Sequence, residues 1–488
     1  MIKFDFDNSY ARELEGFYVS WEGAAAPSPM VIKMNHALAG ELQLDAQALN
    51  SAEGAAILAG AVVPEGAMPL AQAYAGHQFG GFSPRLGDGR ALLLGEVIDQ
   101  RRVRRDIHLK GSGRTPFSRG GDGKAVLGPV LREYLMGEAM HALGIPTTRA
   151  LAAVTTGETI YREGPQPGAV LARVASSHLR VGTFQYIAAH GSQEQLRQLA
   201  DYAIARHYPA LAEAANPYWE LLRAVCTRQA RLIARWMSVG FIHGVMNTDN
   251  MTISGETIDF GPCAFMDAYN PKTVFSSIDT GGRYAYGNQP GIAQWNLARF
   301  AETLLPLIDA NADEAVRMAT AELHRFADQY QEFWLEEMRK KLGLTTNVEG
   351  DLELVDELLA AMAQQHVDFT QLFRGLANAL TGDSARVHSL FADTTAIAAW
   401  VRRWQQRMQT EGADPATQAA AMNQVNPMYI PRNYKVEEAL QAATTGDLTK
   451  FDQLLTVLTT PFSERPEWDA YAQPAPESFG HYVTYCGT

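Results

Sequence analysis

The spacing of apolar residues divides the chain into a front part rich in strands and a rear part rich in helices. Two apolar runs of strand length, at 91–97 and 103–111, follow a glycine-dense block. In the second run, the two-residue period places Ile107 and Leu109 on one face and Lys110 on the other. Lys110 therefore leaves the predicted sheet on its polar face.

Helical spacing begins at 128–144, where Leu131 and Leu135 recur four residues apart. Residues 151–176 then read as three short strands with tight turns. Beyond Ser177 the periodic segments are mainly helical. They lie at 221–240, 293–308, 312–343, 351–365 and 436–458.

A sheet-rich front and a helix-rich rear predict an α+β chain of two lobes with a cleft between them. We place the N-terminal lobe at 1–175, the C-terminal lobe at 176–340 and a helical C-terminal extension at 341–488. Residues 1–65 read as a lead-in segment of the first lobe. We expect the extension to support the C-terminal lobe.

Composition narrows the functional class. At 488 residues, with 47% hydrophobic and 19% charged residues, the chain is too large for a mini-protein and has ample material for a core. The formal net charge of −13 disfavours general nucleic-acid binding, although a local basic pocket for one nucleotide is compatible with it.

Three cysteines are too few for a disulfide scaffold or a zinc cluster. The sequence shows neither a signal peptide nor an apolar run of about 18–20 residues, so we expect a cytoplasmic protein with no membrane partner. We also expect a monomer.

The segment 241–262, FIHGVMNTDNMTISGETIDFGP, carries the clearest chemical signal. It predicts a hairpin with Ser254 and Gly255 at its tip, and with Asn250 and Asp259 on its two sides. Mg²⁺ prefers hard oxygen ligands and usually takes one or two from the protein, completing its shell with water and phosphate. Asn250 and Asp259 are therefore the predicted metal ligands.

Upstream residues fit a phosphate site. Lys110 would hold phosphate oxygens, and Glu133 on the following helix would hold Lys110, as in protein kinases. Glu138 on the same helix competes for that role. Gly87 and Gly89 fit a loop that lets backbone N–H groups approach phosphate, although such a pair is also common in plain turns. Each signal is weak alone, but their order along the chain predicts a protein-kinase-like fold.

One position departs from the kinase pattern. The catalytic aspartate of an active kinase stands two residues after the histidine and five before the asparagine. Counted from His243 or from Asn250, that position holds Val245, which cannot deprotonate a hydroxyl. Asp249 is the nearest replacement, either as the base or as a second carboxylate beside the metal. We favour the base.

Two arginines, Arg173 and Arg180, stand just past the last predicted strand of the front lobe. Guanidinium groups bind phosphate oxygens through two parallel hydrogen bonds, so both side chains are candidates for the cleft. An ordinary helix-surface position remains the alternative for each of them alone.

Several long motifs carry a resemblance to a known family. They are LGDGR, HLKGSGRTPFSRGGDGK, LREYLMGEAM, LARVASSHLRVGTFQ, HGVMNTDNM, IDFGP, NPMYIPRNY and the final YCGT. From about residue 70 to the C-terminus, the chain resembles the selenoprotein O family of protein adenylyltransferases with a pseudokinase fold. The resemblance implies that ATP is bound flipped with Mg²⁺ or Mn²⁺, so that AMP passes to a Ser, Thr or Tyr hydroxyl of a protein.

The resemblance also implies a role for each matching residue. Lys110 with Glu133 would steady the phosphates, and Asp249 would accept the proton. Asn250 and Asp259 would bind the metal. The residues implied to contact the nucleotide are Gly87, Gly89, Arg90, Lys110, Asp122, Gly123, Arg173, Arg180 and Asp259.

Cys486 is third from the end, where eukaryotic members carry selenocysteine, so the chain resembles a bacterial member with cysteine instead. This position suggests a redox role, with Cys226 and Cys263 as alternative disulfide partners, against an ordinary terminal thiol.

UMP transfer stays open as an alternative. One rival function is kinase-like phosphotransfer, against which Val245 argues. A second rival is a nucleotide-binding scaffold without activity, against which the retained Lys110, Asn250 and Asp259 argue.

Overall fold

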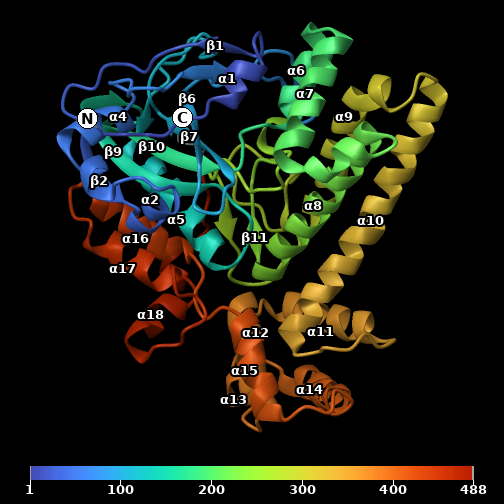
Figure 1. Cartoon of the computed structure of the whole chain (residues 1–488). Coiled ribbons are helices and arrows are strands. Elements are labelled where there is room, and N and C mark those ends of the chain that lie inside the picture. The colour runs from blue at the N-terminus through green and yellow to red at the C-terminus, as the bar shows by residue number, and fades with distance from the viewer. Residues whose placement is uncertain (1, 486–488) are drawn as a thin grey trace.

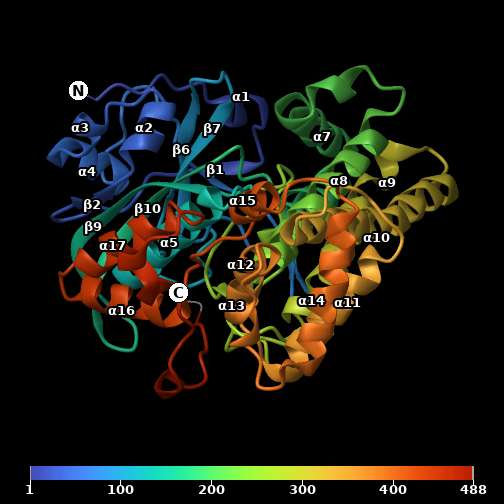
Figure 2. The same cartoon turned by 90° about the horizontal axis from the view of Figure 1, so that it is seen from below.

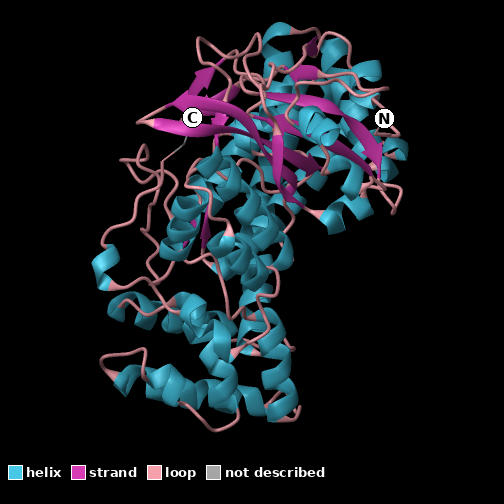
Figure 3. Cartoon of the chain, turned by 90° about the vertical axis from the view of Figure 1, so that its left-hand side faces the viewer, coloured by secondary structure: helices cyan, strands magenta, loops and turns pink. Residues whose placement is uncertain are grey.

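Antiparallel strands from the front of the chain form one sheet at one end of the molecule, and helices make up most of the rest (Figures 1 and 3). This computed structural model describes residues 2–485. The spatial order is β1, β3, β6, β7, β10, β9 and β2, with β8 paired to β10. The bounds are β1 Tyr18–Ser20, β2 Met30–Met34, β3 Leu70–Gln72, β6 Ala91–Ile98, β7 Arg104–Lys110, β8 Ala125–Val126, β9 Arg149–Tyr161 and β10 Pro165–Ala175. The chain thus has the predicted α+β composition.

Different helices cover the two faces of this sheet. Ile107 and Leu109 of β7 are fully buried in one apolar cluster with Leu38 of α2 and Leu58 of α4. The other face packs on α5, whose Leu135 is fully buried. The helices of this part are α1 Ser9–Glu13, α2 His36–Glu41, α3 Ala46–Leu49, α4 Ala52–Leu58 and α5 Leu127–Ala142. The predicted alternation in β7 is confirmed. Helices α2 and α4 of the lead-in segment cover one face of the sheet.

Residues 149–175 form two long strands, β9 and β10, and not the three short strands that were predicted. The physical reason is Gly157, which lies inside β9 with a left-handed φ of 78°. The pairing of β9 with β10 shifts register there, so the glycine marks a bulge in a continuous strand and not a turn between two.

Long helices follow the sheet and pack on one another. Among them, α8 contacts both α9 and α10. They are α6 Val181–His190, α7 Gln193–His207, α8 Pro217–Val239, α9 Gln289–Ile308 and α10 Ala312–Leu342. Two short strand pairs complete this layout, β4 Gly76–Gln78 with β5 Gly81–Ser83, and β11 Phe241–Ile242 with β12 Ala264–Phe265.

The C-terminal helices support two different parts of the molecule (Figures 1 and 2). They are α11 Asp351–Gln365, α12 Phe369–Leu380, α13 Ala385–His388, α14 Thr394–Gln409, α15 Pro415–Val425, α16 Asn433–Thr444, α17 Thr449–Leu458 and α18 Asp469–Ala472. Helices α12 and α15 contact α10, whereas α16 and α17 return to α5. The extension therefore supports the sheet as well as the rear helices, which the sequence did not lead us to expect. Within residues 2–485, no helix is long and apolar enough to cross a membrane.

Candidate active site

A cavity of about 530 Å³ lies where the sheet meets the loops that follow α8. Lys110 reaches it from the end of β7 and Arg173 reaches it from β10. Arg180, which directly precedes α6, also lines it. All the residues predicted to contact nucleotide or metal line this cavity, and so does Asp249. The structure thus brings together side chains that are far apart in the sequence.

The cavity carries a local excess of positive charge in a chain that is acidic as a whole. Four aspartates line it, Asp88, Asp122, Asp249 and Asp259, beside seven cationic residues. The cationic residues are Arg90, Lys110, Arg119, Lys124, Arg162, Arg173 and Arg180. A concave surface with this balance attracts anions. The cavity is therefore suited to a polyphosphate.

Asp259 is the centre of the charged group. Its Oδ1 atom accepts hydrogen bonds from Lys110 Nζ at 2.7 Å and from an Arg173 guanidinium nitrogen at 2.7 Å, and its Oδ2 accepts from Arg180 at 2.6 Å. Burial raises the pKa of Asp259, but these three cations outweigh it and hold the pKa well below its usual range. The backbone of Asp259 has a φ of 60°, a left-handed conformation that aspartate tolerates better than most residues. Asp259 is thus an ionised carboxylate in a fixed position.

Two glutamates on α5 were candidates for the partner of Lys110, and the geometry separates them. Lys110 Nζ lies 2.6 Å from Glu133 Oε2, and Arg173 donates to the other oxygen of Glu133 at 3.0 Å. Glu138 instead binds Arg149, with both contacts at 2.8 Å. Despite its burial, Glu133 has a lowered pKa because both cations stabilise its charge. Glu133 lies behind Lys110 and does not itself line the cavity.

Asp249 differs from Asp259 in its surroundings. Burial raises the pKa of Asp249 to about 6, although nearby Arg180 opposes the shift. Its Oδ2 accepts from Gln78 Nε2 at 3.3 Å, and its backbone carbonyl accepts from Arg180 at 2.6 Å. Its Oδ1 is buried without a hydrogen-bond partner among the described residues. Val245 lines the same cavity, so the two positions considered for a base face one space.

The donor set at Asn250 and Asp259 fits a divalent cation. Asn250 Nδ2 donates to the Val245 carbonyl at 2.9 Å, which orients the amide and leaves its oxygen available. The carboxylate of Asp259 would supply the second hard oxygen, although both of its oxygens accept from Lys110, Arg173 and Arg180 in this structure. Residues 2–485 contain no cluster of three or more His, Cys, Asp or Glu side chains suited to a metal. Two protein ligands suffice for Mg²⁺ when phosphate and water complete the shell.

The glycine-rich loops line the cavity with backbone. At Gly87, which has a φ of 72°, a Cβ atom would lie 2.3 Å from the Phe117 ring, so only glycine fits. The N–H groups of Gly87 and Gly89 donate within the loop region, to the carbonyls of Tyr74 at 3.1 Å and Gly87 at 2.8 Å. These two N–H groups therefore have partners in this structure, and close approach of the backbone is what the glycines contribute.

Asp122 and Gly123 belong to the second loop. Both oxygens of Asp122 accept from the guanidinium of Arg162 at 2.9 Å, which lowers the pKa of Asp122. Arg162 follows β9 and lines the cavity, although no sequence motif pointed to it. The second loop is thereby fixed to the sheet.

Two details differ from the sequence prediction. The hairpin predicted around Ser254 is wrong: Thr252 forms an isolated bridge with Arg180, and Thr257 forms one with Thr147, so the segment pairs outward and not with itself. Arg173 lies inside β10 and not past its end. The first difference follows from long-range pairing, which local periodicity does not encode, whereas the place of Arg173 in β10 agrees with the strand region predicted at 151–176.

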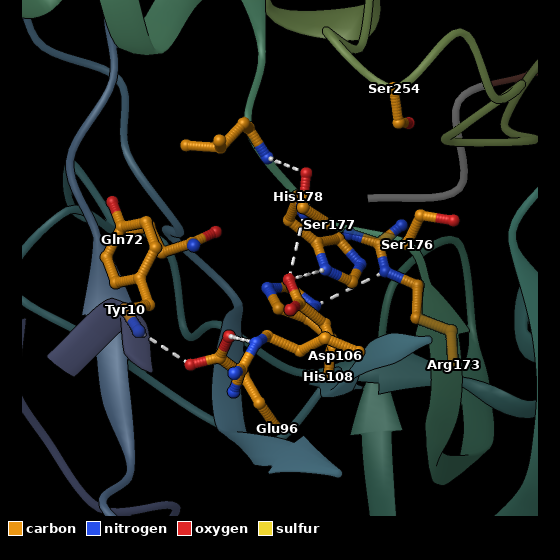
Figure 4. A network of polar contacts seen from close by, with 12 residues as sticks. Tyr10, Gln72, Glu96, Asp106, His108, Arg173, Ser176, Ser177, His178 and Ser254 are labelled. Atoms are coloured by element: carbon orange, nitrogen blue, oxygen red, sulfur yellow. Dashed lines mark hydrogen bonds and ion pairs between the residues drawn. The ribbon is translucent and has the colours of Figure 1, made fainter. Parts of the chain in front are cut away.

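A buried polar network supports Arg173 (Figure 4). Arg173 Nε donates to His108 Nδ1 at 3.3 Å, while His108 Nε2 contacts Asp88 at 3.2 Å. The His108 ring stacks on that of His178 with centroids 4.1 Å apart, and His178 Nδ1 contacts Asp106 at 2.9 Å. Burial lowers the pKa of both histidines. Neutral imidazoles therefore position the arginine without adding charge.

The two described cysteines do not line this cavity. Cys226 on α8 and Cys263 after β11 are buried free thiols, and burial raises the pKa of Cys263 to about 12. Cys486 lies outside the described residues, so its redox role stays a prediction. The chain before it runs beside the site: Thr484 Oγ1 donates to the Pro262 carbonyl at 2.7 Å.

Comparison with known proteins identifies the family of the chain. The family described as "Protein adenylyltransferase SelO" matches residues 1–459. The chain belongs to the SelO family. This match begins at the first residue, well before the motifs that carried the resemblance. SelO membership identifies the chain as a protein nucleotidyltransferase.

Curated relatives extend over the whole chain. A protein of Cereibacter sphaeroides named "Protein nucleotidyltransferase YdiU" is 61% identical, and the alignment covers 100% of both chains. Proteins with the same name from Rhizobium johnstonii and from Mycobacterium sp. strain KMS are each 58% identical. The first covers 99% of this chain and 97% of its own length, and the second covers 100% of both.

Proposed function

We propose that this SelO-family chain transfers AMP from ATP to Ser, Thr or Tyr hydroxyls of proteins, with ATP bound in the flipped orientation. The observation that carries the proposal is the pair of aspartates in one cationic cavity: the Asp259 carboxylate binds three cations, whereas the Asp249 carboxylate binds Gln78. The nine nucleotide-binding residues named from the sequence would hold ATP in this cavity.

A protein-kinase-like fold of two lobes is part of the same proposal. It is supported by a lysine on a central strand paired with a glutamate on the helix packed against that sheet, Lys110 and Glu133. It is also supported by the Asn250 and Asp259 pair on the far side of the cavity. The lobe boundaries at 175 and 340 remain proposals.

In this proposal the acceptor oxygen attacks the α-phosphorus, and the bond between that phosphorus and the bridging oxygen to the β-phosphorus breaks. Asp249 takes the hydroxyl proton, and pyrophosphate leaves with the electron pair of the broken bond. Lys110, Arg173 and Arg180 would bind phosphate oxygens and stabilise the departing charge. A Mg²⁺ or Mn²⁺ ion bound at Asn250 and Asp259 would neutralise phosphate charge.

Val245 favours AMP transfer over phosphate transfer. A kinase needs a carboxylate at this position to receive the acceptor proton, and a valine cannot serve. Asp249 lies four residues further along the loop than Val245. With Asp249 as the base, we propose that the α-phosphate of the flipped nucleotide, and not the γ-phosphate, faces the acceptor hydroxyl. UMP transfer remains a second candidate, because no residue that reads the base is identified.

Labelled ATP tests the proposal. With a protein acceptor and Mn²⁺, we expect label from the α-phosphate on the acceptor and none from the γ-phosphate. The Asp259→Ala variant should lose transfer, while a change of the exposed Asp201 on α7 to Asn should leave it intact. Label from the γ-phosphate would contradict AMP transfer and indicate a kinase. Competition by UTP would measure the preference for the base.

A further inference from the structure

The short hairpin of β4 and β5 forms an uncharged wall of the cavity. It is a separate pair of strands that does not belong to the main sheet. Gln78 and Phe79 line the cavity from this hairpin, and Ile278 lines it from the rear part of the chain. The cationic side chains come instead from the main sheet, the glycine-rich loops and the residue before α6.

Hydrogen bonds fasten this hairpin to the loop that carries Asp249. The backbone N–H of His77 donates to Thr248 Oγ1 at 2.7 Å. The backbone N–H of Phe79 donates to Asn247 Oδ1 at 3.1 Å. Successive residues of the loop thus bind alternate residues of the hairpin, so the two segments form one unit.

The contact continues at the carboxylate itself. Gln78 Nε2 donates to Asp249 Oδ2 at 3.3 Å. At Gly76, a Cβ atom would lie 2.5 Å from Asp249 Oδ1, so the absence of a side chain lets the hairpin approach this closely. Gln78 is therefore placed to fix the orientation of the Asp249 carboxylate.

Phe79 presents an apolar ring at the same edge of the cavity. Phe79 is 39% exposed, and Ile278 is 54% exposed. The φ of Phe79 is 50°, a left-handed conformation that is unusual for a bulky residue and persists only where surrounding contacts impose it. The chain thus keeps an aromatic ring in contact with solvent at the edge of the cavity.

We propose that the β4–β5 hairpin is the acceptor wall of the active site. In this role, Phe79 and Ile278 contact an apolar residue next to the hydroxyl to be modified, and Gln78 positions Asp249. This inference rests on the proposed function. The occupant is a protein segment because the apolar patch is continuous with the cavity, while the phosphates have their partners among the cationic side chains.

Two peptides with one tyrosine each test the apolar contact, one with leucine and one with glutamate beside the tyrosine. With ATP labelled at the α-phosphate, we expect the wild type to favour the leucine peptide about tenfold in kcat/KM. The Phe79→Asn variant should lose this preference, because asparagine accepts the left-handed backbone but lacks the ring. Phe82→Thr is the matched control, since Phe82 is 45% exposed on the same hairpin and does not line the cavity.

An unchanged preference in Phe79→Asn would overturn the hairpin assignment and leave AMP transfer standing. Wild-type protein that labels neither peptide from the α-phosphate, but labels them from the γ-phosphate, would contradict the proposed function itself. The two failures are therefore distinguishable.

Gln78→Leu tests the positioning role. We expect kcat with the leucine peptide to fall by about tenfold or more, while KM for ATP and for the peptide stays at the wild-type value. A purely structural defect would instead change both KM values or lower the melting temperature. An unchanged kcat in Gln78→Leu would show that Gln78 does not position the base.

Discussion

Acidic residues of the same type differ in pKa or in binding partner at this site because their neighbours differ. Asp249 is buried and Asp259 is partly buried. Burial dominates at Asp249 and raises its pKa to about 6, whereas three cations hold the pKa of Asp259 well below its usual range. Glu133 and Glu138 differ in the same way, since one binds Lys110 and the other Arg149. The identity of the partner, and not the residue type, decides which acid can serve the site.

The two glutamates give a matched pair of variants. We expect Glu133→Gln to lower the rate of AMP transfer by about 10-fold to 100-fold, because Lys110 loses the group that orients it toward phosphate. Glu138→Gln should lower the melting temperature through loss of the Arg149 contact, with little change in rate. Transfer of label from the α-phosphate measures the rate, and calorimetry measures stability. Equal losses of rate in both variants would contradict the assignment.

The sequence pointed to several charged residues that line the cavity, but it missed others, such as Arg162, and the uncharged ones. Lys110, Asn250 and Asp259 each stand in a pattern with a known chemical use, so their types and order pointed to one place. Gln78 and Phe79 belong to a glycine-dense block without alternation, and their role depends on a contact with a loop far along the chain. The only available signal was their position just before the glycine loop.

At the scale of elements, long periodic segments were predicted more accurately than short ones. The strands β6 and β7 and the helices α8 to α11 lie within a few residues of their predicted bounds, because each repeats its apolar period several times. The hairpin near Ser254 failed because Thr252 and Thr257 pair with other segments. Strands of three residues such as β4 and β5 are too short to show a period.

Helix α10 contains a second testable feature, a lysine in an apolar environment. Lys341 is 2% exposed, and its Nζ lies 4.3 Å from the centre of the Phe373 ring. Burial lowers the pKa of Lys341 to about 7, so folding disfavours its protonated form. This penalty is full below about pH 7 and fades as the pH rises towards 10.5, the ordinary value, where the unfolded chain also loses the proton.

We therefore expect Lys341→Met to raise the melting temperature at pH 7 by at least about 2 °C and to make it less dependent on pH between 7 and 10. Lys340→Met is the control, because Lys340 is exposed and bound to Glu336 and Glu337. Thermal unfolding at several pH values measures both. A lower melting temperature for Lys341→Met at pH 7 would contradict the assigned penalty.

At the scale of the whole molecule, the C-terminal helices link distant parts of the chain. Helices α16 and α17 pack on α5, the helix that carries Glu133. Lys33 of β2 also reaches Asp452 of α17 at 2.6 Å. Sequence periodicity predicts that such helices form, but it does not say on which surface they pack. Sequence periodicity therefore could not predict that the C-terminal helices pack on the part of the chain that contains the sheet.

Phe451 tests this link. It is fully buried, with its ring 6.1 Å from that of Tyr134 on α5. We expect Phe451→Ala to cost about 3–5 kcal/mol of unfolding free energy and to weaken ATP binding, because the position of Glu133 depends on α5. The exposed neighbour Lys450, changed to Ala, is the control. Denaturant unfolding that shows no loss for Phe451→Ala would mean that α17 is not part of the same folded unit.

The most direct test of the central claim is a crystal structure with Mn²⁺ and an ATP analogue that cannot be cleaved between the α- and β-phosphates. The account predicts the α-phosphorus as the phosphorus atom nearest to Asp249, with Arg173 and Arg180 on the terminal phosphates. It also predicts the anomalous signal of Mn²⁺ at Asn250 and Asp259. A structure with the γ-phosphorus nearest to Asp249 would contradict AMP transfer and support a kinase.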